Sequence, residues 1–155
     1  MKLQELGSPF MNTEKVIAGY LRIASEDLQG AIALAKIPNR NAFYLCAQAA
    51  EKVIRAVLTS EGKHAGIGHQ LDRMVDAIPD ENPIKPLLRA VQGLGVFATS
   101  FRYPTIAGRV KDPPNEAELQ RFAEGVEAAL NEALDRFEVD VSATNQPAGN
   151  KNPIR

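Results

Sequence analysis

The segment 61–69, which reads EGKHAGIGH, has the residue types of a phosphate-binding loop. A Walker loop would need a glycine five residues before Gly62, and that position is Val57. A GxGxxG dinucleotide pattern would begin at Gly66, and its last glycine is replaced by Leu71. Neither nucleotide-binding motif is therefore present, and the glycines are expected to form a turn between two helices.

His69 ends this segment, where a helix is expected to start. The free backbone N–H groups of a helix N-terminus favour anions, so His69 is a candidate phosphate ligand. A capping or packing role is the alternative for this histidine.

Nucleophilic and metal chemistry have less support. Cys46 lies among alanine and leucine, so we expect a small buried side chain rather than a nucleophile. Asp72, Asp76 and Asp80 follow a four-residue spacing that could hold a divalent cation, but a solvated helix face is the favoured interpretation. We predict no catalytic residue, no metal ligand and no cofactor.

Charge is unevenly distributed near the C-terminal half. Residues 85–111 contain five basic residues and no acidic ones, whereas residues 112–140 contain nine acidic residues and two arginines. Arg102, Arg109 and Lys111 lie within a ten-residue stretch of an expected loop, where they could bind a phosphate group. Pairing of these cations with the acidic segment is the alternative.

Composition is that of an ordinary globular domain. The chain has 155 residues, 45% hydrophobic and 24% charged, with a net charge of −1. This balance excludes a generally basic nucleic-acid binder but allows a local basic patch. No apolar run reaches the roughly 20 residues that span a bilayer, and no signal-peptide pattern opens the sequence. We therefore expect a cytoplasmic protein with no membrane partner.

Apolar residues recur at helical spacing through most of the chain, and no alternating pattern indicates a strand. The spacing predicts an all-α, up-and-down bundle of four long helices plus one short helix. The expected helices cover residues 13–37, 40–61, 68–78 (the short one), 86–101 and 116–137. Residues 1–12 are expected to form a loose leader, with Met11 a second possible start codon, and residues 140–155 a disordered tail around the bundle at 13–139.

Three segments resemble the HEPN domain family (higher eukaryotes and prokaryotes nucleotide-binding). Within residues 42–52, the run Gln48-Ala49-Ala50-Glu51-Lys52 is similar to the core of that family's second helix. His69-Gln70-Leu71 is similar to its H-x-L at the third helix, and Arg102-Tyr103-Pro104 to its R-Y-P after the fourth. The matches occur in the family's order and spacing, and the resemblance covers about residues 13–137.

The resemblance implies a helical homodimer, and many members act with a minimal nucleotidyltransferase. Other members are metal-independent ribonucleases of toxin–antitoxin systems, in which four to six residues separate an arginine from a following histidine. This sequence lacks that motif: the corresponding positions before His64 are 57–59, and those before His69 are 62–64, with no arginine in either window.

Carried over residue by residue, the resemblance implies a nucleotide- or phosphate-binding site that includes Lys52, His69, Arg102 and Tyr103, to which the basic loop adds Arg109. Lys52 and Arg102 would neutralise phosphate oxygens, and Tyr103 could stack on a base. A structural ion pair involving Glu51, Lys52 and Arg102 is the alternative.

Three functions follow. The first is a dimeric nucleotide- or phosphate-binding module with a nucleotidyltransferase partner, acting on a nucleotide or RNA. The second is an atypical metal-independent ribonuclease. The third is a purely structural dimerisation module.

Overall fold

The computed structural model of the chain describes residues 9–37, 39–66, 68, 70–143, 148 and 149. Every regular element among them is helical, which confirms the all-α prediction. The elements in chain order are α1 (Pro9–Leu34), α2 (Arg40–Ser60), α3 (Leu71–Asp76), α4 (Lys85–Arg89), the 3-10 helix η2 (Gln92–Ala98) and α5 (Glu116–Arg136).

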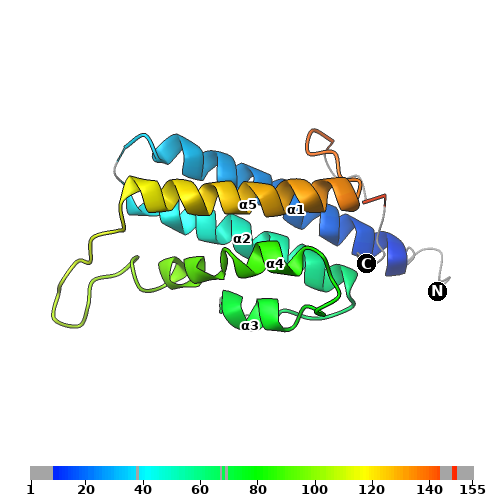
Figure 1. Cartoon of the computed structure of the whole chain (residues 1–155), viewed down its shortest axis with the longest axis horizontal. Helices are drawn as coiled ribbons and strands as arrows, with labels where there is room; N and C mark the ends of the chain where they lie inside the picture. The colour runs from blue at the N-terminus through cyan, green and yellow to red at the C-terminus, as the bar shows by residue number, and fades with distance from the viewer. Residues whose placement is uncertain (1–8, 38, 67, 69, 144–147, 150–155) are drawn as a thin grey trace, which may run out of the picture.

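The chain runs up and down along the long axis of the molecule (Figure 1). α1 and α2 are antiparallel neighbours, α4 and η2 return along the bundle, and α5 runs back beside α1 and α2. α2 contacts α1, α3, η2 and α5, so it is the central helix. Within the described part of the chain, no helix is both long and apolar enough to cross a membrane.

Local sequence explains where α2 and α5 begin. The side chain of Asn39 accepts a hydrogen bond from the backbone N–H of Asn41, and that of Asn115 accepts one from Glu118. Each asparagine therefore satisfies a backbone donor that the first turn of a helix leaves without an intrahelical partner.

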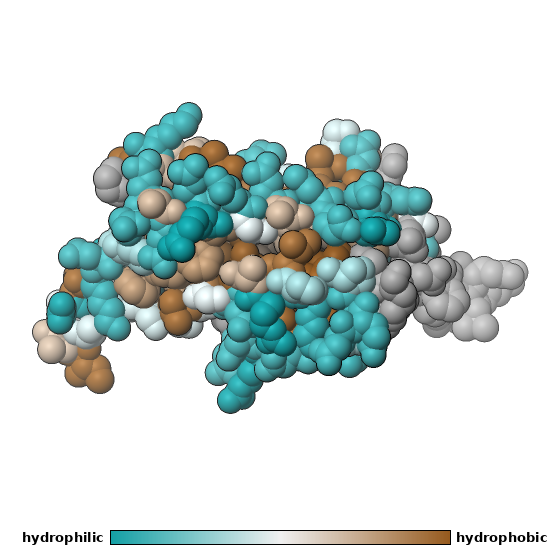
Figure 2. All heavy atoms as spheres, in the orientation of Figure 1, coloured by the Kyte–Doolittle hydropathy of each residue, from teal (hydrophilic) through white to brown (hydrophobic). Residues whose placement is uncertain are grey.

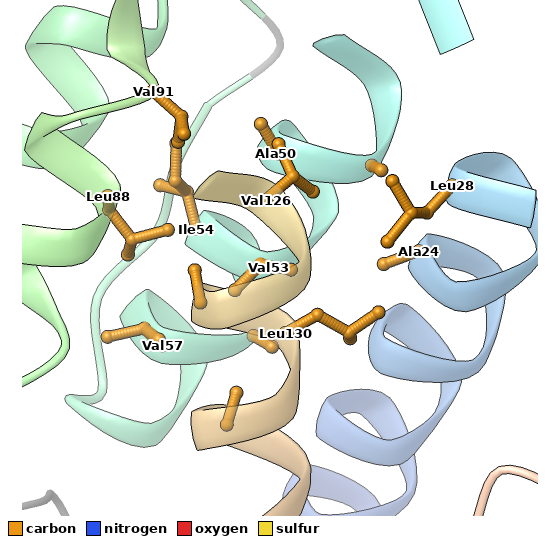
Figure 3. Close-up of a cluster of buried hydrophobic side chains, with 14 of the residues drawn as sticks. Ala24, Leu28, Ala50, Val53, Ile54, Val57, Leu88, Val91, Val126 and Leu130 are labelled. Carbon is orange, nitrogen blue, oxygen red and sulfur yellow. The ribbon is translucent and has the colours of Figure 1, made fainter. Parts of the chain in front are cut away.

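The apolar stripes of the three long helices meet in one core (Figure 3). α1 contributes Ala24 and Leu28, α2 contributes Val53 and Ile54, and α5 contributes Leu130. Burial of a large apolar side chain stabilises the fold by about 1.5–3 kcal/mol, so this core is the main source of stability.

Small residues allow close approach between helices. At Gly30 of α1, a Cβ atom would lie 3.0 Å from Cδ1 of Leu45 on α2, and at Gly125 of α5 it would lie 2.7 Å from Cγ1 of Val91. The absence of a side chain at both glycines leaves room for these neighbouring side chains, which a methyl group would displace.

The segment expected as one helix over 86–101 is helical but divided. α4 ends at Arg89, and the chain continues as the 3-10 helix η2. Gly93 and Gly95 each lower α-helix propensity by about 1 kcal/mol relative to alanine. Gly95 also faces Leu71, whose Cγ would lie 3.5 Å from an added Cβ.

The structure describes parts of both chain ends. α1 begins at Pro9, so residues 9–12 of the expected leader are helical, and proline is well tolerated at the first helical position. In the C-terminal segment, Ala148 is 2% exposed and its N–H donates to the carbonyl of Glu14 at 3.0 Å. The N–H of Gly149 donates to the carbonyl of Phe137. These two residues therefore pack on the bundle, whereas residues 1–8, 144–147 and 150–155 lie outside the described part.

Candidate functional site

Arg102 lies between two aromatic rings just after η2. Its guanidinium carbon is 4.0 Å from the centroid of the Tyr44 ring on α2 and 5.6 Å from that of Tyr103. Arg102 is exposed, and Tyr103 is 67% exposed. A planar guanidinium over an aromatic face is an attractive contact that also orients its N–H groups. The sequence-predicted residues Arg102 and Tyr103 are therefore together, with Tyr44 as a third member.

Arg40, the first residue of α2, holds the loop that carries these residues. Its Nη1 donates to the carbonyl of Phe101 at 3.0 Å and to that of Lys111 at 2.9 Å. One side chain thus fixes both ends of the segment 101–111.

Within this segment a tight turn presents Arg109. The N–H of Thr105 donates to the carbonyl of Arg109 at 2.8 Å, and the Thr105 hydroxyl oxygen accepts from the N–H of Arg109 at 3.0 Å. Gly108 has φ 81°, a left-handed conformation that favours glycine. The side chain of Ile106 at the tip is fully exposed, and Figure 2 shows hydrophobic atoms at the end of this loop.

The basic side chains of the loop have no acidic partner in the described part of the chain. Among the described residues, no ion pair joins Arg102, Arg109 or Lys111 to a carboxylate, and the pairs of α5 lie within that helix. Lys111 instead lies 5.9 Å from the centroid of the Phe101 ring. Pairing with the acidic helix, the alternative for these cations, has no support in this geometry.

Lys52 lies on the same side of α2 as Tyr44 but two turns further along, about 12 Å away. Its Nζ is 2.5 Å from Oδ2 of Asp27 on α1 and 3.3 Å from Oε1 of Gln48. The side chains of Lys52 and Asp27 are 20% and 18% exposed. This half-buried pair links α1 to α2, so Lys52 is separated from the Arg102 cluster and already has a carboxylate partner.

Glu51 and Arg55 form the i,i+4 ion pair that their spacing allows, with Nε 3.2 Å from Oε2. The two Nη atoms of Arg55 also donate to the carbonyls of Gly66 and Gly68, at 2.8 and 3.1 Å. The pair therefore holds the loop that leads into α3. His69, the remaining predicted ligand, lies outside the described residues.

Cys46 is fully buried, and burial raises the pKa of its thiol to about 12. A thiol that stays protonated at neutral pH is a poor nucleophile. The expectation of a small buried side chain is therefore confirmed.

Two of the three aspartates near α3 pair with cations. Asp76 pairs with Arg89 at 2.5 Å and Asp80 with Lys85 at 2.8 Å. A hydrogen bond from Lys85 lowers the pKa of Asp80 below its ordinary value. Across the described ranges, no group of three or more histidine, cysteine, aspartate or glutamate side chains could hold a metal ion.

The site therefore contains one cluster, Arg102 with Tyr44 and Tyr103, and a nearby turn that carries Arg109. Tyr44 was absent from the predicted residues. The available signal was its position one turn before Gln48, on the polar side of an otherwise apolar helix.

Comparisons with known proteins identify a family from the sequence and a similar fold among solved structures. The family model described as HEPN domain matches residues 17–136. The crystal structure of TT1696 from Thermus thermophilus superposes with a TM-score of 0.64 at 20% identity, covering 77% of this chain and 96% of that chain. No curated protein matches the chain.

Proposed function

The chain belongs to the HEPN domain family, and from this premise we propose that it is a dimeric module that binds the phosphate groups of a nucleotide or RNA. The observation that carries the proposal is the guanidinium of Arg102, which lies over the Tyr44 ring and near the Tyr103 ring, with no acidic partner among the described residues.

Stacking leaves the edge of the guanidinium available. Arginine has five N–H donors in a fixed plane, which match phosphate oxygens in a bidentate manner. A contact through the ring face uses none of these donors, so Arg102 is oriented and still able to bind an anion. Arg109 and Lys111 add two exposed positive charges on the same loop.

Tyr103 supplies the second half of the proposed recognition. Its ring is 67% exposed, and an unpaired base stacks well on such a surface. Phosphate contacts from Arg102 and stacking on Tyr103 together suit a nucleotide or a single strand of RNA.

The other predicted ligands have different parts in this proposal. The ion pair of Lys52 with Asp27 favours a role in holding α1 against α2. His69 stays a proposed hydrogen-bond donor near the start of α3, outside the described residues.

The proposed setting is the cytoplasm, as a homodimer with a nucleotidyltransferase partner. A nucleotidyltransferase encoded beside this chain and co-purifying with it is the expected observation. If the chain forms a stable dimer but binds neither nucleotide nor RNA, it is a structural module instead.

Thermal unfolding with ATP, GTP, AMP and short RNA tests the binding itself. A ligand at 100 times its dissociation constant adds about 2.7 kcal/mol, which raises the midpoint by roughly 5–10 °C for a domain of this size. We expect one of these ligands to produce such a shift and Arg102→Ala to remove it. Arg73→Ala, which removes an exposed arginine on α3, should leave the shift unchanged.

The same samples separate binding from catalysis. RNA incubated with the protein in the presence of a chelator should stay intact. Cleavage that Arg102→Ala abolishes would replace the binding proposal with the ribonuclease.

A further inference from the structure

The structure has a cleft of about 590 Å³. The segments that line it lie at the end of the bundle opposite the loop 101–111 (Figure 1). The first turns of α1, the last turns of α2 and the segment 62–66 form its walls. Ligand pockets for small molecules have volumes of about 300–1,000 Å³, so this cleft has the size of a binding site.

The side chains in the described lining of the cleft that can carry a charge near neutral pH are basic. Arg55, Lys63 and His64 line it, and its described lining includes no aspartate or glutamate. Thr13, Thr59 and Tyr20 add polar side chains. A wall with several N–H donors and no carboxylate favours an anion with several acceptor oxygens.

Two of the cations are held in place by other contacts. Arg55 donates through Nε, Nη1 and Nη2 to Glu51, Gly66 and Gly68. The Glu51 carboxylate offsets part of its charge, and two of its five N–H groups have no partner among the described residues. The ammonium of Lys63 donates to the carbonyl of Ala77 at 3.0 Å and keeps two further donors. Because the protein already orients these groups, a ligand would bind without ordering them.

One wall of the cleft is apolar. Val16 is 46% exposed and lies one turn before Tyr20 on α1. A small C–H-rich body could cover these side chains while its anionic group meets Arg55 and Lys63.

We propose that this cleft binds a small phosphate monoester of sugar-phosphate size, through Arg55, Lys63 and His64. The site is separate from the loop that carries Arg102 and does not depend on the proposed function.

Titration of the ¹⁵N-labelled protein with ribose 5-phosphate tests this inference, with ribose and inorganic pyrophosphate as companions. We expect saturable shifts of the Gly62 and Gly66 amides, which line the cleft. Pyrophosphate should shift the same amides, because it shares the phosphate chemistry, and ribose should not.

Lys63→Glu should weaken ribose 5-phosphate binding by about tenfold, since it replaces an attraction with a repulsion. His64→Glu should weaken binding without removing a described hydrogen bond, so it serves if Lys63→Glu unfolds. Arg73→Glu makes the same charge change outside the cleft and should bind like the wild type.

The inference fails if Gly62 and Gly66 do not shift, or if His64→Glu and a folded Lys63→Glu both bind like the wild type. It also fails if Arg102→Ala abolishes the shifts, because the probe would then occupy the loop. Loss of nucleotide binding in Arg102→Ala with these shifts retained would leave both proposals standing.

Discussion

The guanidinium of Arg102 is oriented by aromatic rings and not by a carboxylate. This distinction matters for binding, because a carboxylate partner would compete with a phosphate for the same N–H donors. The sequence identified Arg102 and Tyr103 through one short motif. It could not identify Tyr44, which is 58 residues away and becomes a neighbour only when η2 packs against α2.

Removal of the Tyr44 ring should weaken ligand binding without abolishing it. An exposed cation–π contact is worth about 0.5–1 kcal/mol, so Tyr44→Leu should lower the affinity for the Arg102-dependent ligand roughly two- to fivefold. Calorimetric titration measures this loss. Tyr44→Phe keeps the ring and should bind normally; an equal loss in Tyr44→Phe would mean that the hydroxyl, not the stacking, is needed.

Lys52 gives the contrasting case of a cation that already has a partner. Lys52→Met should lower the free energy of unfolding by about 1–3 kcal/mol, because it leaves Asp27 unpaired in a half-buried position. Urea unfolding measures the change, and Lys52→Met with Asp27→Leu should recover part of it. Normal stability together with lost ligand binding would instead assign Lys52 to the phosphate site.

At the level of elements, the three long helices follow from local information. Their apolar residues recur at helical spacing, and asparagine caps begin α2 and α5. The division between α4 and η2 coincides with Gly93 and Gly95, which lower α-helix propensity, an effect that the apolar spacing does not report. The hydrogen bonds from Arg55 to the carbonyls of Gly66 and Gly68 are non-local, so spacing does not report them either.

Two glycine-to-alanine substitutions should have opposite effects on stability. In Gly125→Ala the new methyl group meets buried Val91. The destabilisation by overpacking, about 1–3 kcal/mol, should exceed the gain in helix propensity, about 1 kcal/mol. In Gly19→Ala nothing lies within 4 Å of the new atom, so α1 should gain up to about 1 kcal/mol. Thermal melts should therefore shift down and up, respectively. A stabilising Gly125→Ala would show that α5 moves away from Val91 easily.

For the whole molecule, the C-terminal segment joins the two ends of the described chain. Nε of Arg22 donates to the carbonyl of Asp140 at 3.1 Å, and Ala148 meets the first turns of α1. Composition predicted a disordered tail, because the segment is polar and contains proline and glycine. The observed contact of Ala148 and Gly149 with the bundle consists of one buried alanine and backbone hydrogen bonds. Composition does not predict a contact of this kind.

Disruption of this contact should destabilise the whole bundle. Ala148→Asp would place a charge where the side chain is 2% exposed, so we expect a lower melting temperature and faster proteolysis near the start of α1. Ser142→Asp, at an exposed position of the same segment, is the matched control. Identical melting of the two variants would show that the segment leaves the bundle at little cost.

The contacts of Arg40 have a consequence for how this protein can vary. The Arg40 side chain holds both ends of the segment 101–111 by hydrogen bonds. A change in sequence between these ends should therefore leave the packing of the bundle unchanged. The entropy of closing a loop rises slowly with length, by about 0.6 kcal/mol for each doubling. The segment should therefore tolerate insertions and replacements. Its ligand could change in this way while the helices that carry it stay the same.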